Sequence, residues 1–208
     1  MKREGQKGLL LIISGPAGSG KGTIVKELLE AYPEEFCLSV SATTRAPRPM
    51  EEHGVHYYFI DKEAFEKRIA EGGMLEYASY CGNYYGTPAE YVKKKLDEGK
   101  NVILEIEVQG ALKVKEALPE TLMVMVTPPD FKTLEARLRG RGTNTEQDIL
   151  NRLATARVEL SNIEHYDYAV VNEDGKADKA ARTVRDIVCC EKKRTVRQPD
   201  FVKNFFEN

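Results

Sequence analysis

The stretch GPAGSGKGT at residues 15–23 decides the fold of this chain. Its residues are Gly15, Pro16, Ala17, Gly18, Ser19, Gly20, Lys21, Gly22 and Thr23. An apolar run at residues 9–14 precedes it and predicts a buried strand, and residues 22–31 after it predict a helix. Glycines let main-chain N–H groups converge on a phosphate, the helix N-terminus adds positive potential, and Lys21 can reach the β- and γ-phosphates. A glycine-rich turn with a surface lysine is the alternative, and the strand–turn–helix context disfavours it.

The end of this loop departs from the commonest phosphate-loop pattern. Gly22 stands where a Ser or Thr usually binds Mg²⁺, and the hydroxyl comes one residue later, at Thr23. The ending GKGT resembles that of nucleoside monophosphate kinases, in which Mg²⁺ is held largely through water. We therefore expect the nine loop residues to bind ATP, with Thr23 contacting phosphate.

Size and composition indicate a single cytoplasmic domain. The chain has 208 residues, of which 41% are apolar and 31% charged, and its formal net charge is −2. Without a basic excess, a general nucleic-acid binder is not expected. Four cysteines (Cys37, Cys81, Cys189 and Cys190) lack CxxC or metal-binding spacing and read as reduced thiols. The run at residues 9–13 is too short to span a membrane, so no membrane partner is expected.

Apolar strands alternate with amphipathic helices along most of the chain, which indicates a parallel sheet covered on both faces. Further strands are predicted at residues 36–43, 56–60, 74–79, 101–107, 121–127 and 168–171, and further helices at residues 61–71, 87–98, 108–118, 130–139, 145–160 and 176–190. Residues 36–85 break this rhythm with short strands and many aromatic residues. The predicted class is an α/β P-loop three-layer fold with a central parallel sheet, an inserted lobe of short mixed strands and a helical lid.

These features predict one domain over residues 1–208 with four parts. They are a core (about 8–35, 86–129 and 162–190), the lobe (about 36–85), the lid (about 130–161) and a charged tail (191–208). The sequence of the tail does not indicate a function.

Two local patterns carry further predictions. Thr87, Pro88 and Glu90 have the spacing of an N-cap, a first helical proline and a capping box. Glu105 and Glu107 alternate with apolar residues, so period two places both acids on one face near the carboxyl end of a strand. An acid there commonly holds Mg²⁺ or its water shell in P-loop enzymes, although two acids can simply emerge at a strand end.

Six segments together resemble the guanylate kinase family, in the family's order and over about residues 9–188. They are the phosphate loop, SVSATTRAPR (39–48), YCGNYYGT (80–87), LEIEVQG (104–110), RLRGRGT (137–143) and Asn172. Apart from the phosphate loop, each is too short to be specific alone.

The resemblance implies how an acceptor GMP is bound. It assigns the GMP phosphate to Arg45, Arg48, Tyr57 and Tyr85 and the guanine to Ser41, Glu76 and Thr87. Arginine forks suit phosphate, and a carboxylate can accept from guanine N1–H and its amine, which adenine lacks as a pair. The resemblance also places Glu107 on the guanine side and Glu105 in the Mg²⁺ shell through water, with these two roles open to exchange. Solvated loop charges and packed tyrosines are the alternatives.

Cations on the predicted lid would stabilise the transferred phosphoryl group, because charge spreads over its oxygens in the transition state. The candidates are Arg137, Arg141 and Arg152, with Lys21 of the loop. Arg139 has no matched role and reads as a solvated helix charge. The resemblance places Asn172 near the adenine of ATP, and a turn-forming Asn is the alternative. The three histidines have no ligand spacing.

The expected function is Mg²⁺-dependent transfer of the ATP γ-phosphate to GMP, giving ADP and GDP, in purine nucleotide metabolism. Alternatives are a kinase for another nucleoside monophosphate or a sugar phosphate, a non-catalytic guanylate kinase-like binding module, and a regulatory P-loop NTPase. Binding modules commonly lack a working phosphate loop, whereas this chain keeps Gly20, Lys21 and Thr23. The sequence leaves a homo-oligomer open.

Overall fold

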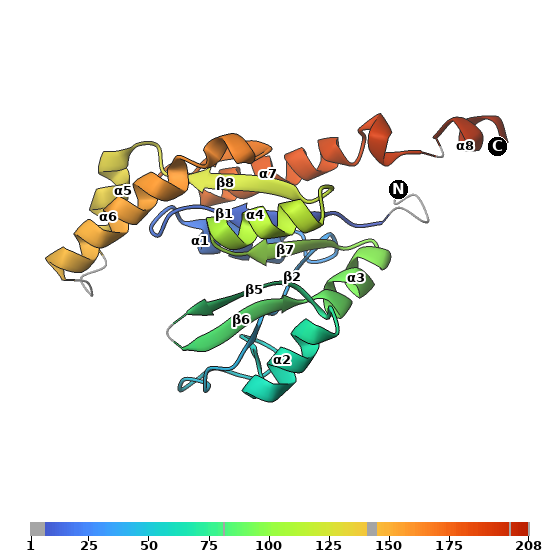
Figure 1. Cartoon of the computed structure of the whole chain (residues 1–208). Coiled ribbons are helices and arrows are strands. Elements are labelled where there is room, and N and C mark those ends of the chain that lie inside the picture. Colours follow the sequence, from blue (N-terminus) through green and yellow to red (C-terminus); the bar gives the residue numbers. More distant parts are fainter. Residues whose placement is uncertain (1–6, 81, 141–144, 200, 208) are drawn as a thin grey trace.

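The computed structural model of the chain describes residues 7–80, 82–140, 145–199 and 201–207. Five strands form the core sheet in the order β2-β7-β1-β8-β9, and all neighbours are parallel. They are β1 Leu10–Ser14, β2 Phe36–Leu38, β7 Asn101–Glu105, β8 Leu122–Thr127 and β9 Tyr168–Val171. The predicted central parallel sheet is confirmed. The carboxyl ends of its strands meet at one edge (Figure 1).

Helices cover both faces of this sheet. Helices α1 (Lys21–Ala31) and α7 (Ala177–Glu191) pack against one face, and α3 (Ala89–Asp97) and α4 (Val108–Ala117) against the other. Along β1, Leu11 and Ile13 belong to the first cluster, whereas Leu10 and Ile12 belong to the second. A strand buried on both sides is apolar throughout, which is why the run before the phosphate loop shows no alternation.

A second, mixed sheet forms the lobe below the core in Figure 1, with strand order β4-β3-β6-β5. Its strands are β3 Ala42–Thr43, β4 Tyr58–Phe59, β5 Met74–Tyr80 and β6 Asn83–Pro88. Helix α2 (Lys62–Ala70) starts at the predicted cap, where Asp61 accepts from the Ala64 N–H. It packs on this sheet through the buried Phe65, whose ring stacks on Tyr84 with centroids 5.3 Å apart.

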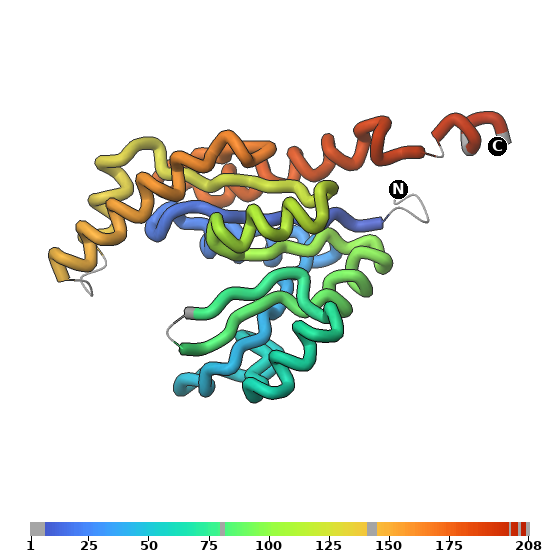
Figure 2. Tube along the Cα trace, viewed as in Figure 1, coloured from blue at the N-terminus to red at the C-terminus, as the bar shows by residue number. Residues whose placement is uncertain are grey.

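Two further helices, α5 (Phe131–Gly140) and α6 (Glu146–Leu160), pair at one end of the molecule through their own apolar cluster. Figure 2 shows them at the opposite end from α8 (Phe201–Glu207), which follows the short helices η1 (Ile163–His165) and η2 (Thr195–Arg197). Among the described residues, none of the helices combines the length and apolar character needed to cross a membrane.

The structure corrects the prediction of one strand over residues 36–43. Phe36–Leu38 pairs with β7 in the core sheet, and Ala42–Thr43 pairs with β4 and β6 in the second sheet. The chain passes from one sheet to the other between these strands, so residues 36–38 belong with the core sheet. Strand propensity correctly predicted extended backbone in both halves of this segment, but it contains no information about which sheet each half joins.

Two predictions at strand–helix junctions were also wrong. Thr87 lies in β6 and does not cap α3, whose N-cap is Pro88; its hydroxyl donates instead to Glu76 Oε1 at 2.8 Å. Strand β7 ends at Glu105, and Glu107 is the N-cap of α4. Period-two alternation therefore stops at Glu105 and cannot place Glu107 on the same face.

Candidate active site

The phosphate loop joins β1 to α1 as predicted. Gly15, Gly18 and Gly20 have φ values of 154°, 94° and 85°. A Cβ on Gly15 would lie 2.2 Å from the Val126 carbonyl oxygen, and one on Gly20 would lie 2.2 Å from Asn172 Nδ2, so both positions need glycine. Gly20 is the N-cap of α1 and offers no side-chain acceptor, which leaves the first N–H groups of the helix for an anion. The Lys21 ammonium donates to the Gly15 carbonyl at 2.9 Å, across the loop.

Arg137 of α5 lies against this loop. Its guanidinium donates to the carbonyls of Gly18 (3.4 Å), Ser19 (3.3 Å) and Asn172 (2.8 Å). It also donates to Asp174 Oδ1, at 2.6 Å from Nη2 and 2.9 Å from Nε. The structure thus brings one predicted lid arginine to the phosphate loop, where an acid after β9 holds it.

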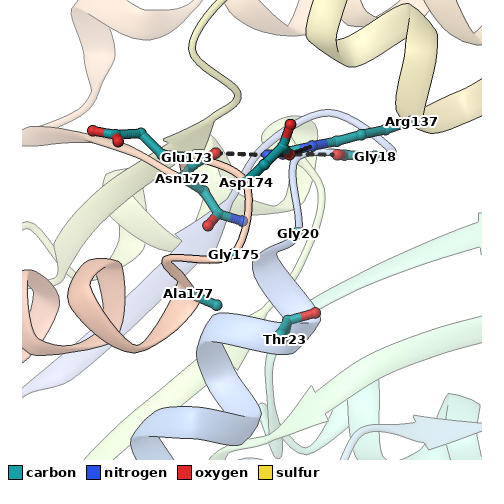
Figure 3. A pocket seen from close by; sticks show the side chains of 9 residues that line it. All are labelled: Gly18, Gly20, Thr23, Arg137, Asn172, Glu173, Asp174, Gly175 and Ala177. Atoms are coloured by element: carbon teal, nitrogen blue, oxygen red, sulfur yellow. Dashed lines mark hydrogen bonds and ion pairs between the residues drawn. The ribbon is translucent and has the colours of Figure 1, made fainter.

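Asn172 follows β9 and is 5% exposed. Its side-chain amide donates to the Ser19 carbonyl at 2.9 Å, so it ties the end of β9 to the phosphate loop. Beside it lies a cavity of about 370 Å³, lined by Gly18, Gly20 and Thr23 on one side and by residues 172–175 and Ala177 on the other (Figure 3). Asn172 is therefore both a structural tie and part of the wall of this cavity.

The other lid arginines differ from Arg137. Arg152 lies exposed on α6, and Arg141 lies outside the described residues. Arg139, predicted to be solvated, has partners: it donates to Glu135 on its own helix (2.9 Å) and to both oxygens of Glu146 on α6 (2.5 and 2.8 Å). These ion pairs link α5 to α6.

Glu105 ends β7 beside the start of α1. A Cβ on Gly22 would lie 3.5 Å from Glu105 Oε1, an ordinary van der Waals contact, so this carboxylate lies next to the phosphate loop. Glu107 is exposed. Its charge affects Glu159 of α6: burial and the Glu107 charge raise the pKa of Glu159, and the Lys21 charge lowers it. Within the described ranges, no three His, Cys, Asp or Glu side chains gather into a metal cage.

Three of the four residues predicted for the acceptor phosphate lie together in the lobe. The Tyr57 and Tyr85 rings have centroids 6.1 Å apart, and the Arg45 guanidinium lies 5.6 Å from the Tyr57 centroid. Burial raises the pKa of Tyr57, so its hydroxyl stays protonated and can donate. The Arg48 side chain is exposed on the loop that follows.

Glu76 and Thr87 face each other in the register of β5 and β6. The Thr87 hydroxyl donates to Glu76 Oε1 at 2.8 Å, and Glu76 Oε2 lies 3.5 Å from where a Cβ on Gly110 of α4 would be. Burial raises the pKa of the Glu76 carboxyl, against the lowering effect of the Thr87 hydrogen bond. Ser41 precedes β3, whose Ala42 pairs with Gly86, the neighbour of Thr87.

Comparisons with known proteins identify the family. The family model described as guanylate kinase matches residues 7–191. The chain is 50% identical to the guanylate kinase of Lactococcus lactis subsp. lactis over 192 residues, 92% of each chain. It is 46% identical to that of Clostridium acetobutylicum over 195 residues, which are 94% of this chain and 91% of that one.

This chain belongs to the guanylate kinase family. Its structure is similar to a crystal structure of guanylate kinase from Anaplasma phagocytophilum, with a TM-score of 0.71 at 33% sequence identity, covering 93% of this chain and 90% of that one. The resemblance inferred from the sequence motifs is confirmed.

Two residues that sequence reasoning missed contact the predicted arginines of this guanylate kinase family member. Glu51 accepts from Arg45, and Asp174 accepts from Arg137. A signal for Glu51 exists in the sequence, since Arg48-Pro49-Met50-Glu51 has proline at the second position of a turn. Asp174 gives no comparable signal, because it meets Arg137 only in the folded chain.

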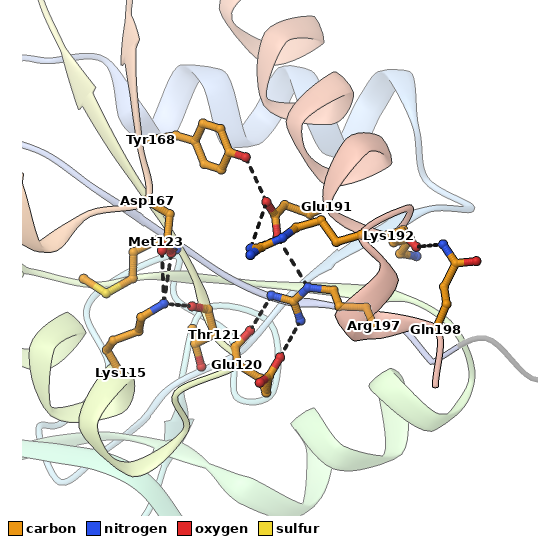
Figure 4. A network of polar contacts seen from close by, with 11 residues as sticks. Lys115, Glu120, Thr121, Met123, Asp167, Tyr168, Glu191, Lys192, Arg197 and Gln198 are labelled. Carbon is orange, nitrogen blue, oxygen red and sulfur yellow. Dashed lines mark hydrogen bonds and ion pairs between the residues drawn. The ribbon is translucent and has the colours of Figure 1, made fainter. Parts of the chain in front are cut away.

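The guanylate kinase family match ends at residue 191, and the tail beyond it is tied to the core (Figure 4). Glu191 is 4% exposed and accepts from the Tyr168 hydroxyl at 2.8 Å. Arg194 and Arg197 bond the same carboxylate, and Arg197 also bonds Glu120. The start of the tail is thus part of the folded domain.

Proposed function

We propose that this chain transfers the γ-phosphoryl group of ATP to the phosphate of GMP, giving ADP and GDP, in purine nucleotide metabolism. The observation that carries this proposal is the Glu76–Thr87 pair, which joins a largely buried carboxylate to a hydroxyl on the same sheet as Tyr85. The same chain keeps Lys21 in a glycine-rich phosphate loop. Membership in the guanylate kinase family supports the same conclusion.

In this proposal the lobe binds GMP. Glu76 accepts from guanine N1–H and the exocyclic amine, Thr87 orients the carboxylate, and Ser41 contacts O6. Glu107 contributes on the guanine side. Arg45, Arg48, Tyr57 and Tyr85 bind the phosphate, and the tyrosines do so as neutral O–H donors. A site that offers a buried acceptor to two donors discriminates against a base that lacks them, by roughly 10⁴ or more.

The phosphate loop binds ATP. The nine residues 15–23 surround its phosphates, and Asn172 lies beside the adenine, in the wall of the cavity next to the loop. Lys21, Arg137, Arg141 and Arg152 neutralise charge that spreads over the oxygens of the transferred group. Arg137 already lies at the loop, so the lid needs to bring only its other cations closer.

The donor set fits a Mg²⁺ ion that keeps most of its water. Mg²⁺ commonly takes one or two carboxylates together with substrate phosphates, and Glu105 presents one carboxylate beside Gly22. Glu105 would hold the ion through water, and Mg²⁺ would neutralise phosphate charge during transfer.

The acceptor is itself a phosphate that reacts in its ionised form. The chain therefore needs no general base and no covalent enzyme intermediate, and its work is positioning and charge stabilisation. Both substrates are intracellular nucleotides, which supports a cytoplasmic location. The net charge of −2 supports the expectation that neither a nucleic acid nor a membrane is a partner of this chain.

An ADP-release assay tests the proposal. With ATP and Mg²⁺, ADP should form rapidly when GMP is present and only slowly when it is absent. AMP and CMP at equal concentration should support little turnover. Release that does not depend on GMP would favour an ATPase, and equal rates with AMP would remove Glu76 from base recognition.

A further inference from the structure

Glu51 lies between the two arginines of the lobe. Its carboxylate accepts from Arg45 Nη2 at 3.0 Å (Oε1) and 2.9 Å (Oε2), and Oε2 also accepts from the Arg48 main-chain N–H at 2.7 Å. The Arg45 and Glu51 side chains are only 16% and 18% exposed. A charge-assisted pair this shielded holds its geometry better than an exposed surface pair.

A strained turn places the Glu51 carboxylate beside the two arginines. The Glu51 N–H donates to the Arg48 carbonyl at 3.0 Å, which closes a four-residue turn with Pro49 at its second position. Met50, at the third position, has φ of 71° and is 94% exposed. A non-glycine residue in this conformation persists only when its surroundings fix it, and the bonds that Glu51 makes to Arg48 and Arg45 do so.

The Arg45 guanidinium is fixed on its other sides as well. It lies 5.6 Å from the Tyr57 ring centroid and 5.8 Å from that of Phe59, and Nη1 donates to the Ala46 carbonyl at 2.7 Å. Its Nε is buried and has no hydrogen-bond partner among the residues that the structure describes. A buried N–H without a partner is rare, and it shows how closely the neighbouring side chains enclose this guanidinium.

A carboxylate at this place could act in two opposite ways. It could occupy the anion site and compete with phosphate, or it could hold the arginines in the geometry that phosphate needs. Competition requires Glu51 to leave, which would break three hydrogen bonds and release the turn around Met50. Holding leaves the exposed Arg48 guanidinium available to the ligand.

We infer that Glu51 is a positioning residue of the acceptor-phosphate site: it fixes Arg45 and the Arg48 main chain so that both arginines meet the phosphate of the acceptor nucleotide. The inference rests on the proposed GMP kinase activity and adds a residue that touches no reacting atom. Glu51 sets acceptor affinity and has no part in ATP binding.

Steady-state kinetics with each substrate varied test the inference. Glu51→Gln keeps the size of the side chain and removes its charge, so the KM for GMP should rise about tenfold or more, while the KM for ATP stays within about twofold. Glu52→Gln makes the same chemical change one residue later and should leave both values unchanged. An unchanged GMP KM in Glu51→Gln overturns positioning, and a lower one establishes competition instead.

Guanosine, which lacks the phosphate, separates positioning from general damage to the lobe. As a competitive inhibitor against GMP, it should have the same inhibition constant with wild type and Glu51→Gln, within about twofold. An inhibition constant that rises as much as the GMP KM overturns the inference.

If Glu51→Gln does not fold, Glu51→Asp takes its place. It keeps the charge at shorter reach and should raise the GMP KM alone, so a rise in both KM values contradicts the inference. Wild type that fails to release ADP with GMP refutes the proposed function, whereas active wild type with unaffected variants refutes only the role of Glu51.

Discussion

Glu76→Gln isolates the contribution of one charge to base recognition. The substitution keeps the shape of the side chain, and its amide oxygen can still accept from the Thr87 hydroxyl, which lies 2.8 Å from Glu76 Oε1. The amide NH₂ then points where the second carboxylate oxygen was, toward donors of the guanine. A charge-assisted hydrogen bond contributes about 1.5–3 kcal/mol, so losing one and opposing two donors should cost about 3 kcal/mol, or roughly 100-fold in the KM for GMP.

The assay is ADP release at varied GMP with saturating ATP, and then the reverse. The KM for ATP should change less than about twofold, because the proposed ATP site is the loop after β1 and not the lobe. Glu90→Gln on the exposed start of α3 is the matched control and should change neither value. Equal losses for ATP and GMP would mean that Glu76 supports the lobe in general, and the guanine assignment would be refuted.

The same variant should be more stable than wild type. Burial raises the pKa of Glu76 above its ordinary value, so the folded state binds the proton more tightly than the unfolded state does. That stabilising contribution is complete below the ordinary pKa and is lost as the pH rises through the raised one, so the ionised carboxylate destabilises the fold at neutral pH. Glu76→Gln should have a higher thermal midpoint than wild type at pH 7.5. The difference between the two midpoints should be smaller at pH 4. A lower midpoint at both pH values would contradict burial as the cause.

Three further outcomes are expected. Lys21→Ala should lower kcat at least about 10³-fold with an unchanged circular dichroism spectrum, and full activity would refute the phosphate-loop assignment. EDTA should stop turnover and added Mg²⁺ should restore it, whereas turnover in EDTA would exclude a metal requirement. Tyr168→Phe should lower the free energy of unfolding by about 1–3 kcal/mol in urea titration, because it removes a donor from the buried Glu191, while the exposed Tyr77→Phe should cost less than about 0.5 kcal/mol. Burial alone would raise the pKa of Glu191, but hydrogen bonds from Tyr168 and Arg194 hold that pKa below its ordinary value. The stability that these bonds contribute is therefore present above the ordinary pKa of a glutamate, and it is lost as the pH falls through the lowered pKa of Glu191.

The parts of the fold that sequence predicted well are those fixed by neighbours in the chain. The phosphate loop needs positive φ at Gly18 and Gly20, and glycine supplies this locally. Asp61 caps α2 through a bond to a residue three positions later. Strand β1 is apolar on both faces, and that run alone indicated a covered parallel sheet.

The failures share a physical cause, which is that the deciding partner is distant in sequence. Thr87 has the local pattern of a cap, but it lies in a strand, and its hydroxyl donates to Glu76, which lies opposite it in the register of two strands. Residues 36–43 have the sequence pattern of one strand, and only the pairing of Phe36–Leu38 with β7 and of Ala42–Thr43 with β4 and β6 shows that the chain changes sheets. Asp174 reaches Arg137 from 37 residues away. Composition and periodicity do not carry such information.

The acids of this molecule explain how a chain with a net charge of −2 can hold cations ready for two phosphorylated substrates. Three cations of the candidate site already have an acceptor: Arg45 has Glu51, Arg137 has Asp174, and Lys21 has the Gly15 carbonyl. The two acids differ in exposure, however, since the Glu51 side chain is 18% exposed and that of Asp174 is 78% exposed. An exposed pair is weak and exchanges its partner easily, whereas a shielded one persists. In the proposed reaction, Arg137 would therefore leave Asp174 for the transferred phosphoryl group during each turnover, while Arg45 would stay on Glu51 and meet the acceptor with its geometry already set.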